Sequence, residues 1–443
     1  MATQTVTYDP SVLQDQALPD ASRRMGFRFV VVYFGLYCFF TQILISLIPI
    51  QNISWMPTDL SRVPPFRWLV LWTAKHVFRA ATTPNYADTG SGDTLFDWVS
   101  TCCLLAIAVI GTAIWVALDR KCRHHDSIAR WFRVSIRICL AGQMIGYGLS
   151  KVIPVQMPFP SLYRLIEPYG NLSPMGVLWA SIGASPAYEI FAGCAELLGG
   201  ILLIFPRTTT FGALICLADM TQGFMLNMTY DVPVKLLSFH LILLSLVLLA
   251  PDFSRLMRFF FLHDVTEAPR SWDLFATRRA NRIAFGVQVV FGVSLLASAL
   301  YGSITGWHKY GGGSPKSELY GIWDVDELVM DGKPREPLTT DRERWRRVVF
   351  EFQKATMFQK MDDSLAWYSL TLNSKDQTLS LTKRDDKNWK ASFTYKRGPN
   401  DGLEMDGTVD GHPTHMLLHL KDSSQYLLVS RGFHWISETP FNR

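Results

Sequence analysis

Long apolar segments constrain the fold of this 443-residue chain more than any other feature. A helix of about 20 apolar residues crosses the hydrocarbon core of a bilayer. Seven segments reach this length, at residues 27–49, 96–118, 132–153, 183–205, 208–227, 233–251 and 283–305. They predict a polytopic α-helical membrane bundle with about seven transmembrane helices. Two shorter stretches, 66–78 and 253–262, are typical of helices that lie along a membrane surface.

Lysine and arginine residues are distributed unevenly among the segments that connect these helices. The connections 119–133 and 251–282 hold many of them, whereas 154–182 holds only Arg164. Cytoplasmic loops are enriched in Lys and Arg. The pattern therefore predicts a bacterial inner (cytoplasmic) membrane protein with a cytoplasmic N-terminus and a periplasmic C-terminal part. We attribute the net charge of +5 to the basic residues that orient the helices in the membrane, and no nucleic-acid partner is predicted.

The chain is expected to divide into six regions. They are a cytoplasmic tail (1–26), two N-terminal transmembrane helices with an external loop (27–131), a four-helix bundle (132–262), a cytoplasmic connection with the last helix (263–310), a Gly/Ser/Pro linker (311–318) and an external β-barrel (319–443).

The C-terminal region reads as short runs of alternating polarity separated by turn residues, a pattern typical of antiparallel strands. About eight runs, from "GIWDVDELVM" to "QYLLVSRGFHWI", predict a small closed all-β antiparallel barrel. Gly321 and Trp323 in the first run, with Arg431 in the last, resemble the lipocalin pattern. In that pattern the Arg packs over the Trp and closes the barrel. An eight-stranded barrel either holds a small apolar ligand or is filled by its own side chains, and both alternatives stay open.

Polar and ionisable side chains gather in the third to sixth apolar segments. Such groups are costly in lipid, so they usually face the bundle interior or a water-filled cavity. We therefore expect a polar funnel that opens to the periplasmic side and binds a ligand. Its predicted lining is Gln143, Tyr147, Lys151, Gln156, Glu189, Glu196, Asp219, Gln222, Asn227, Tyr230, Asp231, Lys235 and His240.

Structural roles compete with functional ones at several of these positions. Asp231 and Lys235 are four residues apart and could simply cap and pair at the start of a helix. His240 could be a hydrogen-bonding residue of the core. Glu196 and Asp219 lie near mid-depth, where function is the default hypothesis for a carboxylate. If the chain is an enzyme, these two carboxylates, Lys235 and His240 are the candidate catalytic residues. No His/Cys cluster has metal-ligand spacing, so no metal site is predicted.

Three stretches of the bundle carry a family resemblance. "GYGLSKVIPVQM", "FAGCAELLGGILLIFPRTTTFGALI" and "MLNMTYDVPVKLLSFHLILLSLVLL" resemble the DoxX/DoxD-like membrane proteins. Lys151, Glu196, Arg207 and Asp219 stand at positions that match the motif of that family. The resemblance covers residues of about 132–251 and implies a four-helix core. It also implies a part in membrane thiol, sulfur or quinone redox chemistry, often as a subunit or accessory.

These observations lead to three hypotheses. In the first, the bundle binds a quinone or another lipophilic small molecule in a redox-associated role, with membrane lipid and a redox protein as partners. In the second, the chain is a non-enzymatic anchor or assembly factor whose barrel binds a lipid, a small molecule or a protein. In the third, it is a membrane enzyme at the outer face, with Lys235 as base and His240 assisting. No cofactor is evident from the residues themselves, and quinone is implied by the resemblance alone.

Overall fold

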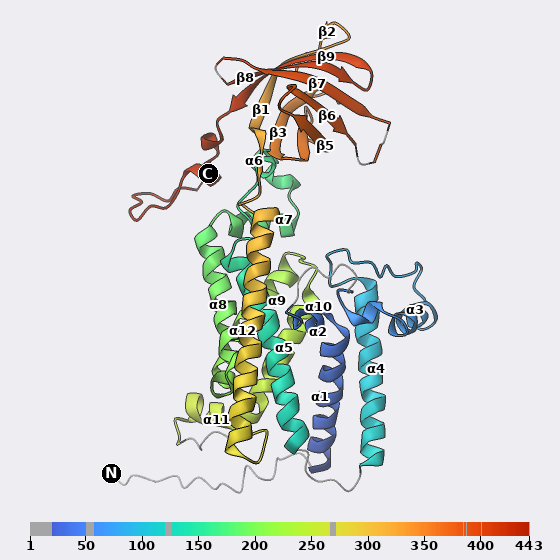
Figure 1. The fold of residues 1–443 in the computed structure, drawn as a ribbon, viewed down its shortest axis with the longest axis vertical. Helices are drawn as coiled ribbons and strands as arrows, with labels where there is room; N and C mark the ends of the chain where they lie inside the picture. Colours follow the sequence, from blue (N-terminus) through green and yellow to red (C-terminus); the bar gives the residue numbers. More distant parts are fainter. Residues whose placement is uncertain are drawn as a thin grey trace, which may run out of the picture. The chain divides into compact units, whose positions relative to one another are not determined.

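The computed structural model describes residues 20–49, 57–119, 126–265, 272–383, 385–386, 388–399 and 401–442. The chain forms two compact units, one of Met1–Leu149 and Gly193–Gly302 and one of Ser150–Ala192 and Ser303–Arg443. The first is helical and the second contains a β-barrel (Figure 1). Residues 1–19 of the predicted tail lie outside the described residues, and the first helix already begins at Asp20.

Each long apolar segment of the sequence forms a helix. The long helices are α1 (Asp20–Phe40), α4 (Leu95–Leu118), α5 (Asp126–Val152), α8 (Pro186–Ile204), α9 (Thr209–Thr229), α10 (Lys235–Leu249) and α12 (Arg278–Lys309). The first segment is interrupted after Phe40, and the short α2 (Gln42–Ser46) follows. Among the described residues, four helices are long and apolar enough to cross a membrane: Leu95–Leu118, Pro186–Ile204, Lys235–Leu262 and Arg278–Lys309.

The two shorter stretches also form helices. They are α3 (Phe66–His76), and α11 (Phe253–Met257) with η6 (Arg258–Leu262). Trp68 and Trp72 are exposed on α3, and Phe259, Phe260 and Phe261 are exposed on η6. Exposed aromatic side chains are what a helix at a membrane surface presents.

Glycines bring three helices of the first unit into backbone contact. A Cβ atom added at Gly148 of α5 would lie 2.6 Å from the Leu197 backbone nitrogen of α8. A Cβ at Gly200 of α8 would lie 3.0 Å from the Ile145 nitrogen of α5, and Gly212 of α9 is as close to α8. The small residues of α8 therefore permit close helix packing, as the sequence indicates.

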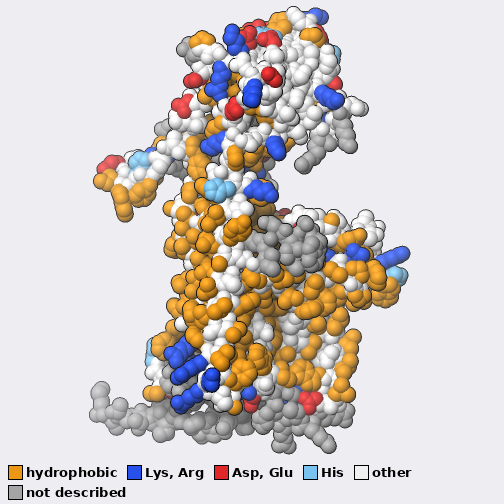
Figure 2. Space-filling view, in the orientation of Figure 1, with side chains coloured by type: hydrophobic (Ala, Val, Ile, Leu, Met, Phe, Trp, Pro, Cys, Tyr) orange, Lys and Arg blue, Asp and Glu red, His pale blue; other side chains and the backbone are white. Residues whose placement is uncertain are grey.

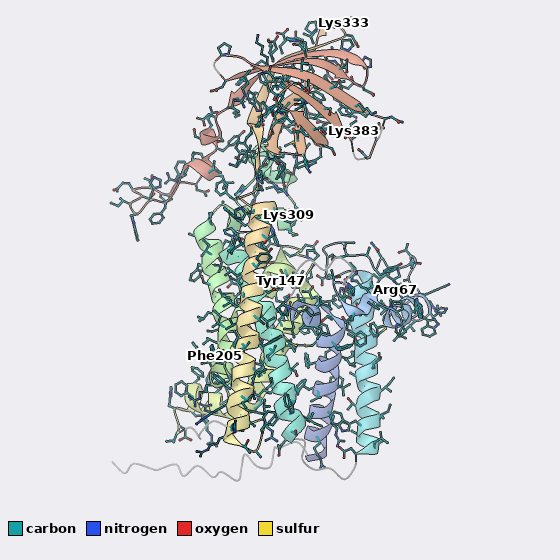
Figure 3. The ribbon with its side chains drawn as sticks, viewed as in Figure 1. Arg67, Tyr147, Phe205, Lys309, Lys333 and Lys383 are labelled. Carbon is teal, nitrogen blue, oxygen red and sulfur yellow. The ribbon has the colours of Figure 1, made fainter. Side chains whose placement is uncertain are left out.

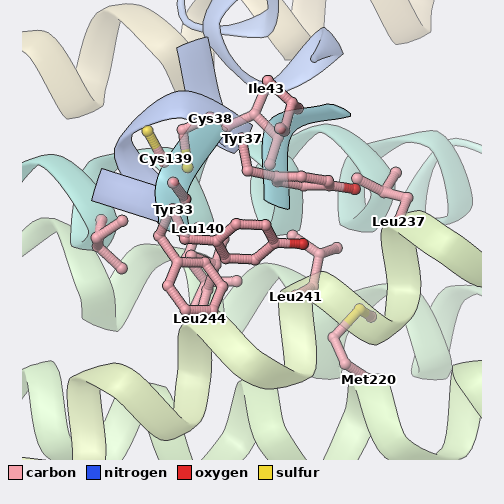
Figure 4. Close-up of a cluster of buried hydrophobic side chains, with 14 of the residues drawn as sticks. Tyr33, Tyr37, Cys38, Ile43, Cys139, Leu140, Met220, Leu237, Leu241 and Leu244 are labelled. Atoms are coloured by element: carbon pink, nitrogen blue, oxygen red, sulfur yellow. The ribbon is translucent and has the colours of Figure 1, made fainter. Parts of the chain in front are cut away.

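The largest core of the helical unit joins α1, α5, α9 and α10 (Figure 4). Tyr33 and Tyr37 of α1 lie in it beside leucines of α10, and Ile43 of α2 is fully buried. Cys38 and Cys139 meet there within hydrogen-bonding reach. The first helix is thus part of the same core as the bundle.

The second unit contains a closed antiparallel barrel of eight long strands. They are β1 (Lys316–Met330), β3 (Trp345–Phe352), β4 (Ala355–Lys360), β5 (Leu365–Asn373), β6 (Thr378–Thr382), β7 (Lys390–Arg397), β8 (Gly402–Val409) and β9 (His412–Lys421), with the two-residue β2 (Lys333–Pro334) beside β1. Each long strand pairs with its neighbour in sequence, and β1 also pairs with β9. The barrel confirms the predicted all-β fold. The linker is shorter than predicted, because β1 begins at Lys316.

Two of the predicted strands differ from those observed. The structure has a strand at Ala355–Lys360 that the sequence did not predict. Only Gln353 and Lys354 connect it to β3, and neither is a typical turn residue. The run "QYLLVSRGFHWI", predicted as the last strand, instead begins at the last residue of η7 (Ser423–Gln425) and contains α13 (Leu427–Ser430).

The barrel interior is filled by its own side chains. Trp345 and Phe358 lie 4.4 Å apart between ring centroids, Phe358 and Tyr368 lie 5.0 Å apart, and Tyr368 and Trp389 lie 4.8 Å apart. Trp323 is 2% exposed among them, and its indole N–H donates to the Leu319 carbonyl at 2.8 Å. Of the two alternatives for this barrel, the structure supports the filled one.

A short helix covers part of the outer surface of the barrel. Leu162 and Ile166 of α6 (Leu162–Ile166) pack on Ile322, Val349 and Met357. These three alternate along their strands with interior residues, so they face outward. The unit also includes η3 (Tyr169–Asn171) and α7 (Pro174–Gly183).

Glu351 and Gln359 fix this helix by hydrogen bonds. The Glu351 carboxylate accepts from the Leu162 N–H at 3.1 Å, and the Gln359 amide donates to the Ile166 carbonyl at 3.1 Å. Burial raises the pKa of Glu351 to about 7, although the Leu162 N–H and Lys316 favour its charged form. The attachment of α6 therefore depends on a carboxyl group that titrates near neutral pH.

We expect the unit that α6 and the barrel form to lose stability as the pH rises. The folded unit binds the Glu351 proton more tightly than the unfolded chain, so its contribution is complete below pH 4.5 and is lost as pH rises through about 7. The loss is at most about 3 kcal/mol. Hydrogen exchange of α6 and β3, corrected for intrinsic rates, should show less protection at pH 8 than at pH 5. Glu351→Gln should remove the difference, and an unchanged difference would assign it to another group.

Candidate functional site

His240 has a structural environment in the core of the helical unit. Its Nδ1 lies 2.7 Å from the Leu236 carbonyl oxygen one turn earlier, so Nδ1 carries a proton and donates. Its Nε2 lies 2.8 Å from the Tyr33 hydroxyl, which is then the donor. The Tyr37 ring stacks on the imidazole at 3.7 Å between centroids. Both ring nitrogens are engaged, and the side chain is 3% exposed.

Lys235 lies at the start of α10, where an aspartate from another segment caps the helix. The Asp93 carboxylate accepts from the backbone N–H groups of Lys235 at 2.7 Å and Leu236 at 2.9 Å. The Lys235 ammonium lies 2.8 Å from Asp231 and 3.9 Å from Asp93. Asn227 donates to the Ser238 hydroxyl at 3.0 Å. These contacts fix the helix start, which is the structural alternative considered for Asp231 and Lys235.

Gln143 and Tyr147 form a polar network with α2. Gln143 donates to the Ser46 hydroxyl at 2.5 Å. Gln42 donates to the Gln143 side-chain oxygen at 3.4 Å and to the Tyr147 hydroxyl at 3.2 Å. The network joins α2 to α5 and satisfies the buried Gln143 amide.

Glu196 and Asp219 come together near Cys216. Both carboxylates are close enough for their charges to act on the Cys216 thiol, and that of Glu196 also acts on Tyr147. Glu196 is 7% exposed, whereas Asp219 is half-buried. Of the other predicted residues on α9, Gln222 is exposed and Tyr230 follows the helix end.

Three predicted residues belong to the second unit. Glu189 is fully buried, and its carboxylate accepts from the Met157 N–H at 3.0 Å. Lys151 is close enough for its charge to act on Glu189. The Gln156 side chain accepts from the Ser150 hydroxyl at 3.1 Å. These residues fix the segment that follows α5, and the predicted funnel set is divided between the two units.

The predicted contact between Arg431 and Trp323 is wrong. Arg431 is not on a strand: it follows α13, and its guanidinium lies 4.1 Å from the centre of the Phe441 ring. Pairing of β1 with β9 closes the barrel instead, with Trp323 opposite Leu420. Gly321 is required there for another reason, because its φ is +147° and a Cβ would lie 2.3 Å from the Leu420 side chain.

A large cavity lies at the other end of the helical unit from the start of α10. Its volume is about 1410 Å³. The segments around it are the N-terminal part of α5, η4 (Pro206–Thr208), the first turns of α9, α11 with η6, and the first turns of α12. None of the residues predicted for the funnel lines it. Figure 3 labels Phe205, which lines the cavity, and Tyr147 of the predicted set, at different levels of the unit.

The cavity combines aromatic and cationic side chains. Its aromatic residues are Phe205, Phe211, Phe259, Phe260, Phe285 and Trp272. Its charged residues are Arg133, Arg207, Arg255, Arg278, Arg282, Asp252 and Asp273. Lys and Arg side chains gather at this end of the unit, next to a surface of apolar side chains (Figure 2). An apolar wall with clustered cations suits an amphiphilic molecule that carries oxygen acceptors.

Sequence reasoning missed this cavity because the residues looked like topology signals. Four of its five arginines lie in the two basic connections, 119–133 and 251–282, that were used to orient the helices, and Arg207 lies outside them. The signal that could have found it is the mixture of Arg with Phe in "PRTTTF" and "FSRLMRFFFL". Arg207, which matches the family motif of the resemblance, is one of the lining residues.

The barrel surface also holds three groups that could bind a metal ion. Glu404 and Asp406 of β8 and His415 of β9 each offer a ligand atom, and these atoms lie within 4.8 Å of one another. Asp406 is directly opposite His415 in the strand register. One imidazole and two carboxylates suit a divalent transition metal. The sequence did not predict this set, because pairing of two strands brings the groups together.

Comparison with known proteins gives one relative. The chain is 30% identical over 143 residues to "Uncharacterized protein YwoB" of Bacillus subtilis (strain 168), which is 32% of this chain and 91% of the relative. No family model matches the chain. No solved structure matches it either.

The two aspartates at the start of α10 should differ in their effect on stability. Asp93→Ala removes the acceptor of two helix N–H groups and should lower the free energy of unfolding by about 1–2 kcal/mol. Asp231→Asn removes an ion pair whose carboxylate is 84% exposed and keeps a residue type that tolerates the positive φ of this position, so it should change stability by less than about 0.5 kcal/mol. Thermal unfolding in detergent compares the two variants. Equal effects would contradict the capping role of Asp93.

Proposed function

We propose that this chain, which belongs to the family of the Bacillus subtilis protein YwoB, is a membrane protein that binds a lipophilic molecule in the cavity of its helical unit. One observation carries the proposal: a space of about 1410 Å³ has aromatic walls and five arginines. Ligand sites are concave and mostly apolar, with a few polar groups that orient the ligand. This cavity has that composition and exceeds the roughly 300–1,000 Å³ that drug-sized ligands occupy.

The ligand in this proposal has an apolar body and a head that accepts hydrogen bonds. Guanidinium groups donate to carboxylate, phosphate or carbonyl oxygens. A quinone head offers carbonyl oxygens. In one form of the proposal the ligand is therefore a quinone, and the site has the redox-associated role that the DoxX/DoxD-like resemblance implies. In that form a redox protein is the partner of the chain. A lipid with an acidic head satisfies the same groups without electron transfer.

A second candidate function is favoured by the filled barrel. Its interior holds Trp323, Phe350 and Phe358, each at most 2% exposed, in place of a ligand. The outer surface of the barrel is then the part available to a protein partner. This is the anchor or assembly role, and the two proposals can hold together because they concern different units.

The proposal includes a membrane topology. The bias of Lys and Arg fits a bacterial inner-membrane protein with a cytoplasmic N-terminus and a periplasmic barrel. In this topology the cavity lies at the cytoplasmic ends of the helices. Arg279 is exposed next to the cavity without lining it. In a chain whose seven native cysteines are replaced by serine or alanine, a cysteine in its place should react with a membrane-impermeant thiol reagent in inverted vesicles and stay unreactive in intact spheroplasts. The reverse pattern would invert the topology.

Filling the cavity should displace the ligand. Ala284 of α12 lines the cavity, so Ala284→Trp places an indole in the space. We expect the amount of lipophilic molecule that co-purifies with the full chain to fall by about tenfold or more, which corresponds to about 1.4 kcal/mol of binding free energy. Mass spectrometry of the extracted small molecules measures the loss and identifies the ligand as quinone or lipid.

Two control variants locate the effect. Val287→Trp adds the same indole on the same helix, at a residue that is 62% exposed and does not line the cavity. It should leave the co-purified ligand unchanged. Glu196→Gln tests the polar group that the sequence singled out, and it should also leave the ligand unchanged. If Glu196→Gln loses the co-purified ligand and Ala284→Trp keeps it, the ligand binds in the predicted funnel and the proposal for the cavity is rejected.

A further inference from the structure

The five arginines of the cavity fall into two groups. Arg133 is engaged: it donates to the Leu248 carbonyl at 2.7 Å, lies 3.5 Å from Asp252, and stands 4.5 Å from the centre of the Trp272 ring. Arg255 lies 3.8 Å from Asp252. These two arginines and Asp252 form a fixed part of the wall, and Thr210 adds a hydrogen bond to the same carboxylate at 2.7 Å.

The other three arginines have no such partners. Arg207 of η4 and Arg278 and Arg282 of α12 make no hydrogen bond or ion pair with any other part of the chain that the structure describes. All three are exposed. Arg278 and Arg282 are four residues apart and therefore lie on one side of α12. Within the part of the chain that the structure describes, three guanidinium groups without a protein partner thus line one cavity, and they come from two segments far apart in sequence.

The charge balance of the cavity calls for an anion. Among the lining residues that the structure describes, five guanidinium groups face two carboxylates, and the carboxylate of Asp252 is already shared by Arg133, Arg255 and Thr210. An oxyanion between the exposed guanidinium groups accepts charge-assisted hydrogen bonds from more than one of them. The planar fork of arginine matches the oxygens of a phosphate.

The apolar wall indicates where this anion comes from. Phe211, Phe259 and Phe260 line the cavity and are 59%, 62% and 54% exposed. On α12, the apolar window that could cross a membrane is only 11% buried within the chain. A soluble anion gains nothing from these exposed rings, whereas acyl chains attached to the anion would cover them.

We propose that Arg207, Arg278 and Arg282 bind the phosphate of an anionic phospholipid, whose acyl chains lie against the phenylalanines of the cavity. This inference rests on the proposed function and names the class of its ligand. Phosphatidylglycerol is a suitable probe because its head carries a phosphate and no cation. Phosphatidylcholine with the same acyl chains is the matched probe, because its head adds a choline cation that the excess of arginines repels.

The experiment measures lipid binding to the full chain. Delipidated protein in detergent is titrated with each phospholipid and with inorganic phosphate, and bound lipid is counted by native mass spectrometry. We expect wild type to prefer phosphatidylglycerol by about tenfold or more. The triple variant R207Q/R278Q/R282Q should lose this preference. R279Q removes a neighbouring charge that does not line the cavity, and it should keep the preference.

Each outcome decides one point. Loss of the preference in the triple variant but not in R279Q supports the inference. If millimolar inorganic phosphate displaces phosphatidylglycerol, the arginines bind free phosphate and the inference of a lipid is overturned. Equal binding of both lipids in wild type and the triple variant would overturn the phosphate site. If Ala284→Trp then still prevents binding, the proposed function stands and only the head-group assignment fails.

Discussion

Backbone contact between α5, α8 and α9 is the constraint on which the rest of the helical unit depends. Gly148, Gly200 and Gly212 let these helices approach until no side chain fits at the crossing points. Helices that pack this closely leave little room for a ligand between them. The polar residues nearby, such as Gln143 and Glu196, therefore lie next to protein groups. Open volume occurs where the helices end, around the connecting segments.

The sequence predicted those parts of the fold that depend on local pattern. Apolar length identified the long helices, and alternation of polarity identified most of the strands. The strand at Ala355–Lys360 was missed because the residues before it carry no turn signal. The final run was assigned wrongly as a strand, because it begins at the last residue of η7 and contains α13. Its exposed Phe433 and Trp435 show that apolar content alone does not imply burial in a barrel.

The candidate site was harder to predict, because it depends on which segments meet. Lys235 and His240 looked like catalytic groups along the chain, yet the Lys235 ammonium pairs with Asp231 and lies 3.9 Å from Asp93, and the His240 ring bonds to Tyr33 of the first helix. Four of the five arginines of the cavity looked like orientation signals. Both interpretations of those arginines are compatible, since a charge that orients a helix end also lies at the depth of lipid head groups.

The contacts of the first helices with α10 make this helix depend on residues far from it in sequence. Tyr33 and Tyr37 enclose His240, and Asp93 completes the start of the same helix. A chain truncated to begin after α4 would expose an imidazole nitrogen and two backbone amides that Tyr33 and Asp93 now satisfy. The four helices α5, α8, α9 and α10 are therefore not a module that can be cut from this chain without cost, because α10 would keep polar groups whose partners had been removed.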